Sequence, residues 1–310
     1  MKVLFTFPGQ GNQYEGMLND LPKHRLAQQY LQQASEALGQ DILTLDSKEA
    51  LASTRAVQLC LLVTGVINAA VLMDNDIIPD MVSGMSIGAF PAAVISKSLS
   101  FSDAVKAVSL RGTLMQQAYP TGYGMAAIIG LNRWQVAELV EQVHSQQAPV
   151  YLANVNSEQQ IIISGSIQAM EKVMQLAQNS GASCAKRIRI SVPSHCELLL
   201  EPAKKLAQAL SHYAIQKPAI MYLSSSSARP CNTVDKVIDD LAFNMSRSVL
   251  WHETTIAAYE RGVRLAIEVP PNSVLTRLSK SVMADGYAVA QSETELATLQ
   301  VLYQRQKNDA

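Results

Sequence analysis

The stretch Gly84-Met85-Ser86-Ile87-Gly88 decides the fold predicted for this chain. It matches G-x-S-x-G between a short apolar run and a helix-forming run, which is the pattern of a nucleophile elbow, a sharp turn from a strand into a helix. Such a turn holds a serine hydroxyl beside backbone N–H donors and makes it a better nucleophile. Because glycine and serine are common turn residues, the pattern needs partner residues before it identifies an enzyme.

The composition predicts a folded protein without a highly charged surface. The 310 residues are 48% apolar and 16% charged, and the net charge of −1 gives no electrostatic footprint for nucleic acid or an anionic membrane. The four cysteines show no C-x-x-C spacing, which indicates free thiols in a reducing compartment and no zinc site. The first apolar run is too short for a signal-peptide core, so we expect a cytoplasmic protein. The longest apolar stretch, residues 56–73, contains polar side chains and is predicted to be a buried helix, with no membrane partner.

Alternating apolar and helical runs predict two domains. Residues 123–193 read β-α-β-β-α-β, which is the order of a small ferredoxin-like subdomain. Residues 1–122 and 194–310 are then one discontinuous α/β-hydrolase-like domain with a mostly parallel sheet, because their strands are separated by helices. Within it, a helix is expected over residues 102–118 with Ser102 as its N-cap.

The glycine-rich turn Pro8-Gly9-Gln10-Gly11 follows the first predicted strand. It is not a dinucleotide fingerprint, because Tyr14 occupies the position of the third glycine. It either presents backbone N–H groups to a neighbouring oxyanion or is a tight turn without a ligand.

His195 is the candidate base among five histidines. It stands in Val192-Pro193-Ser194-His195-Cys196, where the last subdomain strand ends and a helix begins. Cys196 is discounted as the nucleophile, because neighbouring residues on regular structure do not face each other. No acidic residue stands out as a third member, so a backbone carbonyl is the expected support of a Ser-His dyad.

Several ordered motifs together carry a family resemblance. The chain resembles the malonyl-CoA:acyl-carrier-protein transacylase family over nearly its whole length. The motifs are Phe7-Pro8-Gly9-Gln10-Gly11, Gly84-x-Ser86-x-Gly88, Arg111-Gly112 with Met115-Gln116, residues 124–131, Asn154 with Asn156, and residues 192–196.

The resemblance implies a role for each matched residue. Ser86 would be the acylated nucleophile, and His195 would move its proton. Arg111 would hold the malonyl carboxylate with its planar fork. This implies a ping-pong transfer from malonyl-CoA to an acyl carrier protein, with no permanently bound cofactor or metal.

Four further residues are implied to complete the site. The backbone N–H groups of Gln10 and Ile87 would receive the oxyanion. Asn154 and Asn156 match polar substrate-binding positions of the family, although a structural turn is an equal interpretation.

The chain departs from the family pattern at Met85, Ala89 and Leu250, where histidine, an acidic residue and glutamine are usual. In the family the residue at the Leu250 position can support the histidine through its backbone carbonyl, and the resemblance implies the same for Leu250. Residues 51–60, 86–93, 117–125 and 260–271 resemble the malonyltransferase (epsilon, or H) subunits of bacterial malonate decarboxylases. That resemblance implies an acceptor on the complex's small carrier subunit with its dephospho-CoA-type arm, and a role in priming decarboxylation. A fatty-acid or polyketide transacylase is the alternative.

Two other functions stay open on the sequence. A thioesterase-type serine hydrolase shares the elbow and base but needs no buried arginine, and Arg111 falls between apolar residues. A non-catalytic acyl-binding scaffold would accommodate the changed residues. Lys186, Arg187 and Arg189 are either a solvated basic strand or a contact for CoA phosphates or an acidic carrier, with Arg187 and Arg189 on one strand face.

Overall fold

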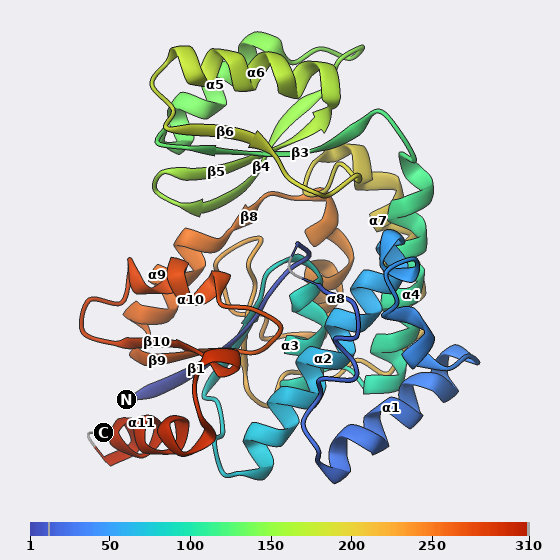
Figure 1. Cartoon of the computed structure of the whole chain (residues 1–310), viewed down its shortest axis with the longest axis vertical. Coiled ribbons are helices and arrows are strands. Elements are labelled where there is room, and N and C mark those ends of the chain that lie inside the picture. Colours follow the sequence, from blue (N-terminus) through green and yellow to red (C-terminus); the bar gives the residue numbers. More distant parts are fainter. Residues whose placement is uncertain (12, 309–310) are drawn as a thin grey trace.

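The computed structural model describes residues 1–11 and 13–308. It contains two five-stranded sheets, which we name the larger and the smaller sheet after the larger and smaller predicted domains. The smaller sheet lies above the larger one with its two helices on top (Figure 1). The predicted α/β class is confirmed.

The larger sheet is parallel throughout. Its strand order is β10-β9-β1-β2-β7, and all four neighbouring pairs run in the same direction. The central strand β1 (Lys2–Phe7) is buried from Val3 onward, as expected for a parallel strand covered on both faces. The other strands are β2 (Met81–Gly84), β7 (Met221–Leu223), β9 (Val263–Glu268) and β10 (Tyr287–Ala290).

Nine helices of the described residues pack around this sheet. They are α1 (Arg25–Leu38), α2 (Thr54–Asp74), α3 (Ala89–Ile95), α4 (Phe101–Ala118), α7 (Leu200–Leu210), α8 (Val234–Phe243), α9 (Trp251–Glu260), α10 (Val274–Lys280) and α11 (Leu296–Asn308). Among the described residues, α2 alone is long and apolar enough to cross a membrane. Since 89% of its most apolar window is buried inside the protein, α2 is a core helix, as predicted.

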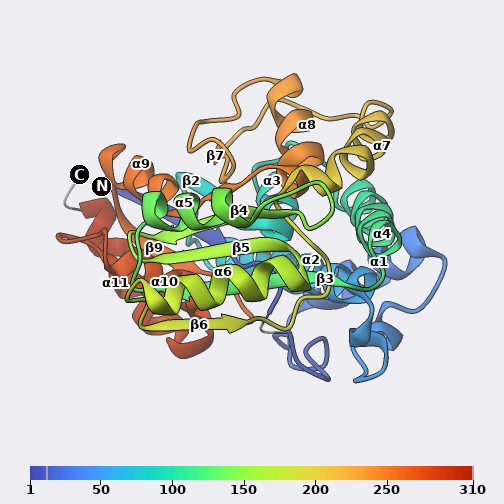
Figure 2. The ribbon, with the colours of Figure 1, turned by 90° about the horizontal axis from the view of Figure 1, so that it is seen from above.

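The smaller sheet is built mainly from the inserted segment. It contains β3 (Tyr123–Ile129), β4 (Val150–Ser157), β5 (Gln160–Ser166) and β6 (Cys184–Arg187) in the order β6-β3-β5-β4, with antiparallel neighbours. The helices α5 (Arg133–Val143) and α6 (Ile167–Asn179) cross its outer face side by side (Figure 2). This arrangement is consistent with the ferredoxin-like βαββαβ order.

One strand of the smaller sheet comes from elsewhere in the chain. The two-residue strand β8 (Val249–Leu250) pairs in parallel with β4. The smaller sheet therefore continues into the segment that the sequence assigns to the larger domain. The division at residues 122/123 and 193/194 stays a prediction.

Two sequence expectations about element ends are wrong. Helix α4 begins at Phe101, and its N-cap is Ser100, whose side chain accepts a hydrogen bond from the Asp103 N–H, so Ser102 lies inside the first turn. Strand β6 ends at Arg187, so Arg189 does not share a face of that strand with it. Both errors arise because neighbouring residues offer the same local signal and tertiary contacts choose between them.

Gly112 explains how α4 approaches α2. A Cβ at this position would lie 2.5 Å from the Arg55 Cα and 3.0 Å from its backbone nitrogen, which leaves no room for a side chain. Arg111, which precedes Gly112 on α4, is also in the protein interior, where it is 0% exposed.

We predict that Gly112→Ala lowers the free energy of unfolding by about 1–3 kcal/mol, because the added methyl group forces two backbones apart. Urea denaturation followed by circular dichroism measures this change. Gln117→Ala, on an exposed position of the same helix, is the control and should stay within about 0.5 kcal/mol of the original protein. Equal stability of the two variants would contradict the close approach.

Candidate active site

Ser86 lies where the chain turns from β2 into α3. Its backbone φ is 57°, in the left-handed region, which costs a non-glycine residue about 1–3 kcal/mol. The residues Ser86–Gly88 form one turn of 3-10 helix before α3 begins. A strained serine on a strand-to-helix turn is the predicted nucleophile elbow.

The two glycines of the motif are required by close backbone contacts. A Cβ on Gly84 would lie 1.9 Å from the carbonyl oxygen of Gly88, and one on Gly88 would lie 2.1 Å from the carbonyl oxygen of Phe7. Both distances are far below any contact that a methyl group tolerates. The sequence signal at these two positions therefore reports the geometry of the turn itself.

His195 lies in the same cavity as Ser86 and is 3% exposed. It also has a left-handed backbone, with φ of 65°, and its N–H donates to the Met245 carbonyl over 2.7 Å. Among the described residues, the Ser86 hydroxyl has its hydrogen bond from Arg111 and none with His195. A base-to-nucleophile contact that is loose without substrate is common in hydrolases and transferases.

Two backbone carbonyls fix the orientation of the imidazole. His195 Nδ1 donates to the Asn244 oxygen at 2.7 Å and to the Arg247 oxygen at 3.2 Å. Because both partners only accept, Nδ1 carries the proton and Nε2 is left as the basic nitrogen. The expectation that a carbonyl supports the base is met, but Leu250 is not its source, since the Leu250 carbonyl accepts from the Thr254 hydroxyl.

Arg111 reaches the elbow from α4. Its side chain is completely buried, and its NH2 group donates to the Ser86 hydroxyl at 3.3 Å and to Asn244 Oδ1 at 3.0 Å. Its Nε and NH1 groups have no hydrogen-bond partner within the described part of the chain. Buried guanidinium donors without acceptors indicate a site for an anion.

Burial governs the titration of both charged groups. It lowers the pKa of Arg111 to about 9. Burial, with the positive charge of Arg111 second, also lowers the pKa of His195 to about 4, against the smaller opposing effect of the two carbonyls. His195 is therefore neutral and basic across the physiological pH range, as a proton acceptor must be.

The cavity that contains Ser86 and His195 has a volume of about 130 Å³. Asn154 and Asn156 line it from β4 and are 6% and 8% exposed, and the side-chain oxygen of each lacks a donor among the described residues. Both lie within a strand, so the interpretation as a turn is wrong for them. Each of the two residues thus lines the cavity and has a buried side-chain oxygen that can accept from an N–H group.

Gln10 and Ile87 both lie near the nucleophile. Gln10 lines the cavity, while Ile87 follows Ser86 directly and is fully buried. The neighbouring Gly9 is so close to the elbow that a Cβ there would lie 3.2 Å from the Met85 carbonyl oxygen. The first turn of the chain thus lies against the elbow, while the oxyanion role of the two backbone N–H groups stays a prediction.

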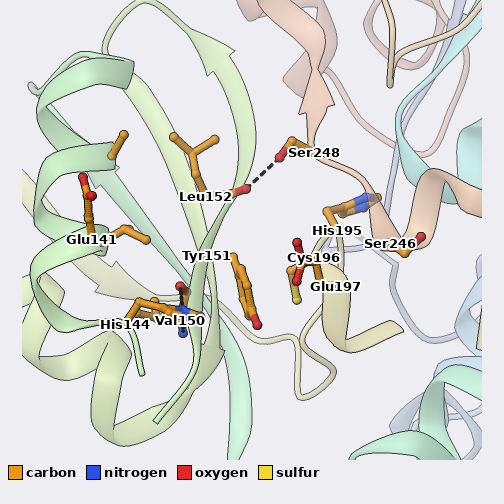
Figure 3. Close-up of a pocket in the computed structure, with 12 residues that line it drawn as sticks. Glu141, His144, Val150, Tyr151, Leu152, His195, Cys196, Glu197, Ser246 and Ser248 are labelled. Atoms are coloured by element: carbon orange, nitrogen blue, oxygen red, sulfur yellow. Dashed lines mark hydrogen bonds between the residues drawn. The ribbon is translucent and has the colours of Figure 1, made fainter. Parts of the chain in front are cut away.

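A wider groove of about 490 Å³ opens on another side of His195 (Figure 3). Tyr151 and Leu152 line it from β4, and Cys196 and Ser248 line it from segments on the opposite side (Figure 3). The Ser248 hydroxyl donates to the Leu152 carbonyl at 2.8 Å and ties the two sides together. His195 thus lines both cavities.

The basic residues Lys186, Arg187 and Arg189 are exposed. Between and after the two arginines, Ile188 and Ile190 line the Ser86 cavity. The segment therefore carries its charges close to the cavity wall, and a contact with CoA or a carrier stays a prediction.

The comparisons with known proteins agree with this geometry. Residues 4–310 match the model of the acyl transferase domain family. The chain belongs to the acyl transferase family. This acyltransferase is 34% identical over 296 residues to the malonyl CoA-acyl carrier protein transacylase of Haemophilus influenzae, covering 93% of this chain and 95% of that one. It is 32% identical to the transacylase of the same name from Bacillus subtilis strain 168, covering 99% of each.

Solved structures show the same fold over the full length of the acyltransferase. The crystal structure of FabD from Acinetobacter baumannii is 33% identical with a TM-score of 0.92, covering 100% of this chain and 99% of the other. A malonyl-transacylase solved in complex with a type II PKS acyl-carrier protein is 31% identical with a TM-score of 0.90, covering 98% and 100%.

The sequence did not identify Asn244 and Arg247 as site residues. They follow α8, in a segment without a charged or glycine-rich pattern, and they act on His195 through backbone carbonyls that every residue type carries. No side-chain signal could have marked that role.

We predict that the acid limb of the acylation rate lies near pH 4, because His195 is protonated only below its lowered pKa. Stopped-flow acylation by an acetyl thioester, which has no carboxylate to titrate, measures the limb. In the control Arg111→Met, loss of the positive charge should move the limb toward higher pH, and burial keeps it below the ordinary value of about 6.5. A limb near 6.5 in the unaltered enzyme would contradict the buried, neutral base.

Proposed function

We propose that this acyltransferase moves a malonyl group from malonyl-CoA to the thiol of an acyl carrier protein. The observation that carries the proposal is a fully buried arginine, without an acidic partner among the described residues, in contact with the candidate nucleophile. Such an arginine fits an acyl group that ends in a carboxylate. Relatives at 32–34% identity are named for this reaction.

The first half-reaction acylates Ser86. His195 Nε2 takes the hydroxyl proton while Oγ attacks the thioester carbonyl, and the backbone N–H groups of Gln10 and Ile87 stabilise the tetrahedral oxyanion. The C–S bond then breaks, and the CoA sulfur leaves with the proton from His195. The product is a malonyl-serine ester and free CoA.

The second half-reaction runs the same steps with a new thiol. The carrier thiol gives its proton to His195 and attacks the ester carbonyl, and Ser86 Oγ leaves with that proton. Ser86 and His195 work as a dyad here, since the carbonyls of Asn244 and Arg247 supply the orientation that a third acidic residue gives elsewhere.

Arg111 selects the acyl group. A carboxylate that accepts from NH2, in place of the Ser86 hydroxyl, and from the unpaired Nε or NH1 group forms a bidentate, charge-assisted pair, which lysine cannot reproduce. A thioesterase-type hydrolase or a scaffold gains nothing from keeping this cation buried, because burial without a ligand costs free energy.

Asn154 and Asn156 are proposed to bind the arm that carries the thiol. Both residues line the Ser86 cavity and have unpaired side-chain oxygens, and the arm common to CoA and acyl carriers contains amide N–H groups from which these oxygens would accept. Malonyl-CoA is then a transient substrate and not a bound cofactor. The cytoplasmic location of the protein stays a prediction.

The acceptor is first proposed to be an ordinary acyl carrier protein of fatty-acid or polyketide synthesis. The relatives' names and the complex of one relative with a type II PKS acyl-carrier protein favour it over the malonate decarboxylase carrier. The second candidate is that decarboxylase carrier, with its dephospho-CoA-type arm. Met85, which lines the cavity, and the fully buried Ala89 favour it, because both replace polar groups beside the elbow.

The acceptor can be identified by loading the enzyme with a radiolabelled malonyl group and adding the two holo-carriers at equal concentration. The rate at which each carrier removes the label from the enzyme is then compared. We expect the phosphopantetheine carrier to discharge the enzyme faster. Faster discharge by the decarboxylase carrier would assign the protein to that complex instead.

We predict that mixing the enzyme with malonyl-CoA adds the mass of one malonyl group, because the ester on Ser86 is stable until a thiol arrives. Intact-protein mass spectrometry measures it. Ser86→Ala should abolish the adduct. Arg111→Ala should reduce malonyl loading by about 100-fold or more while sparing acetyl loading, since a buried charge pair is lost. An adduct that persists in Ser86→Ala would refute the mechanism.

A further inference from the structure

Asn244 touches both functional side chains of the site. It directly follows α8, is 1% exposed, and accepts the His195 Nδ1 hydrogen bond with its backbone carbonyl. Its side-chain oxygen accepts a separate hydrogen bond of 3.0 Å from the Arg111 NH2 group. The two contacts use different parts of one residue, so a change of side chain removes the second and keeps the first.

Arg111 remains an uncompensated cation in this arrangement. Within the described residues, the groups that its guanidinium contacts are the Ser86 hydroxyl and the Asn244 amide oxygen, both neutral. Three buried donors at this point, Arg111 Nε and NH1 and Asn244 Nδ2, have no acceptor among the described residues. A carboxylate offers acceptors only, and so it complements this cluster.

We infer that Asn244 is a positioning residue that sets the acyl specificity, because its neutral amide orients the Arg111 guanidinium without cancelling the charge that the substrate carboxylate needs. This inference rests on the proposed malonyl transfer and adds to it a residue whose side chain does not take part in proton movement. Aspartate has nearly the same shape as asparagine but would form a buried ion pair with Arg111 and cancel the charge that the substrate carboxylate needs.

The test compares malonyl-CoA and acetyl-CoA loading of Ser86 in Asn244→Asp and Asn244→Leu by quenched-flow mass spectrometry. In Asn244→Asp the ratio of malonyl to acetyl loading rates should fall by about 100-fold or more, because the aspartate carboxylate already neutralises the guanidinium that the malonyl carboxylate needs. In Asn244→Leu, which leaves the charge in place but releases the guanidinium, the ratio should fall by about 10-fold, mainly through a higher KM for malonyl-CoA.

Acetyl loading reports on the dyad in each variant, since the backbone carbonyl at position 244 is retained. It should fall less than malonyl loading in both variants, whereas a purely structural role would lower acetyl and malonyl loading together. An unchanged ratio in both variants, or a parallel loss of the two rates, overturns the inference. Thermal unfolding identifies a variant that does not fold, and the other variant then decides.

The same experiment separates this inference from the proposed function. If the original enzyme loads malonyl in preference to acetyl and the variants do so equally well, the role of Asn244 is wrong and malonyl transfer stands. If the original enzyme shows no preference for malonyl, the proposed function itself fails.

Discussion

The buried guanidinium of Arg111 is the constraint on which the rest of the site depends. Removing a positive charge from water is costly, and no acidic side chain among the described residues repays that cost. Arg111 reaches the elbow from α4, where its NH2 group donates to the Ser86 hydroxyl and to the Asn244 side chain. The fold therefore keeps a buried positive charge next to Ser86.

The positive charge of Arg111 also affects the pKa of His195. Arg111 adds to burial in lowering the pKa of His195, and the carbonyls of Asn244 and Arg247 oppose it weakly. A base with a pKa of about 4 accepts a proton reluctantly, and a bound malonyl carboxylate would offset the charge of Arg111 and make that step easier. Binding of a malonyl group would thus favour the proton transfer to His195 that the transfer of this group requires.

The sequence predicted those parts of the site that depend on side-chain or glycine chemistry. Gly84 and Gly88 could be recognised because only glycine fits there: a Cβ would lie 1.9 Å or 2.1 Å, respectively, from a backbone carbonyl oxygen. The three functional side chains were found because each lies in a sequence motif of the family; they are Ser86, His195 and Arg111. The support of His195 was assigned to Leu250 and belongs to Asn244 and Arg247, because a backbone carbonyl leaves no trace in the sequence. Short strands such as β8 form through tertiary pairing, which local propensity does not report.

The central claim is that the site binds the carboxylate of a malonyl group esterified to Ser86. A crystal structure of the malonyl-loaded enzyme, trapped without carrier, tests it most directly. The account predicts the ester on Ser86 Oγ and both carboxylate oxygens paired with Arg111, with the Asn244 amide still in contact with the guanidinium. An ester whose carboxylate points into solvent, away from Arg111, would contradict the account.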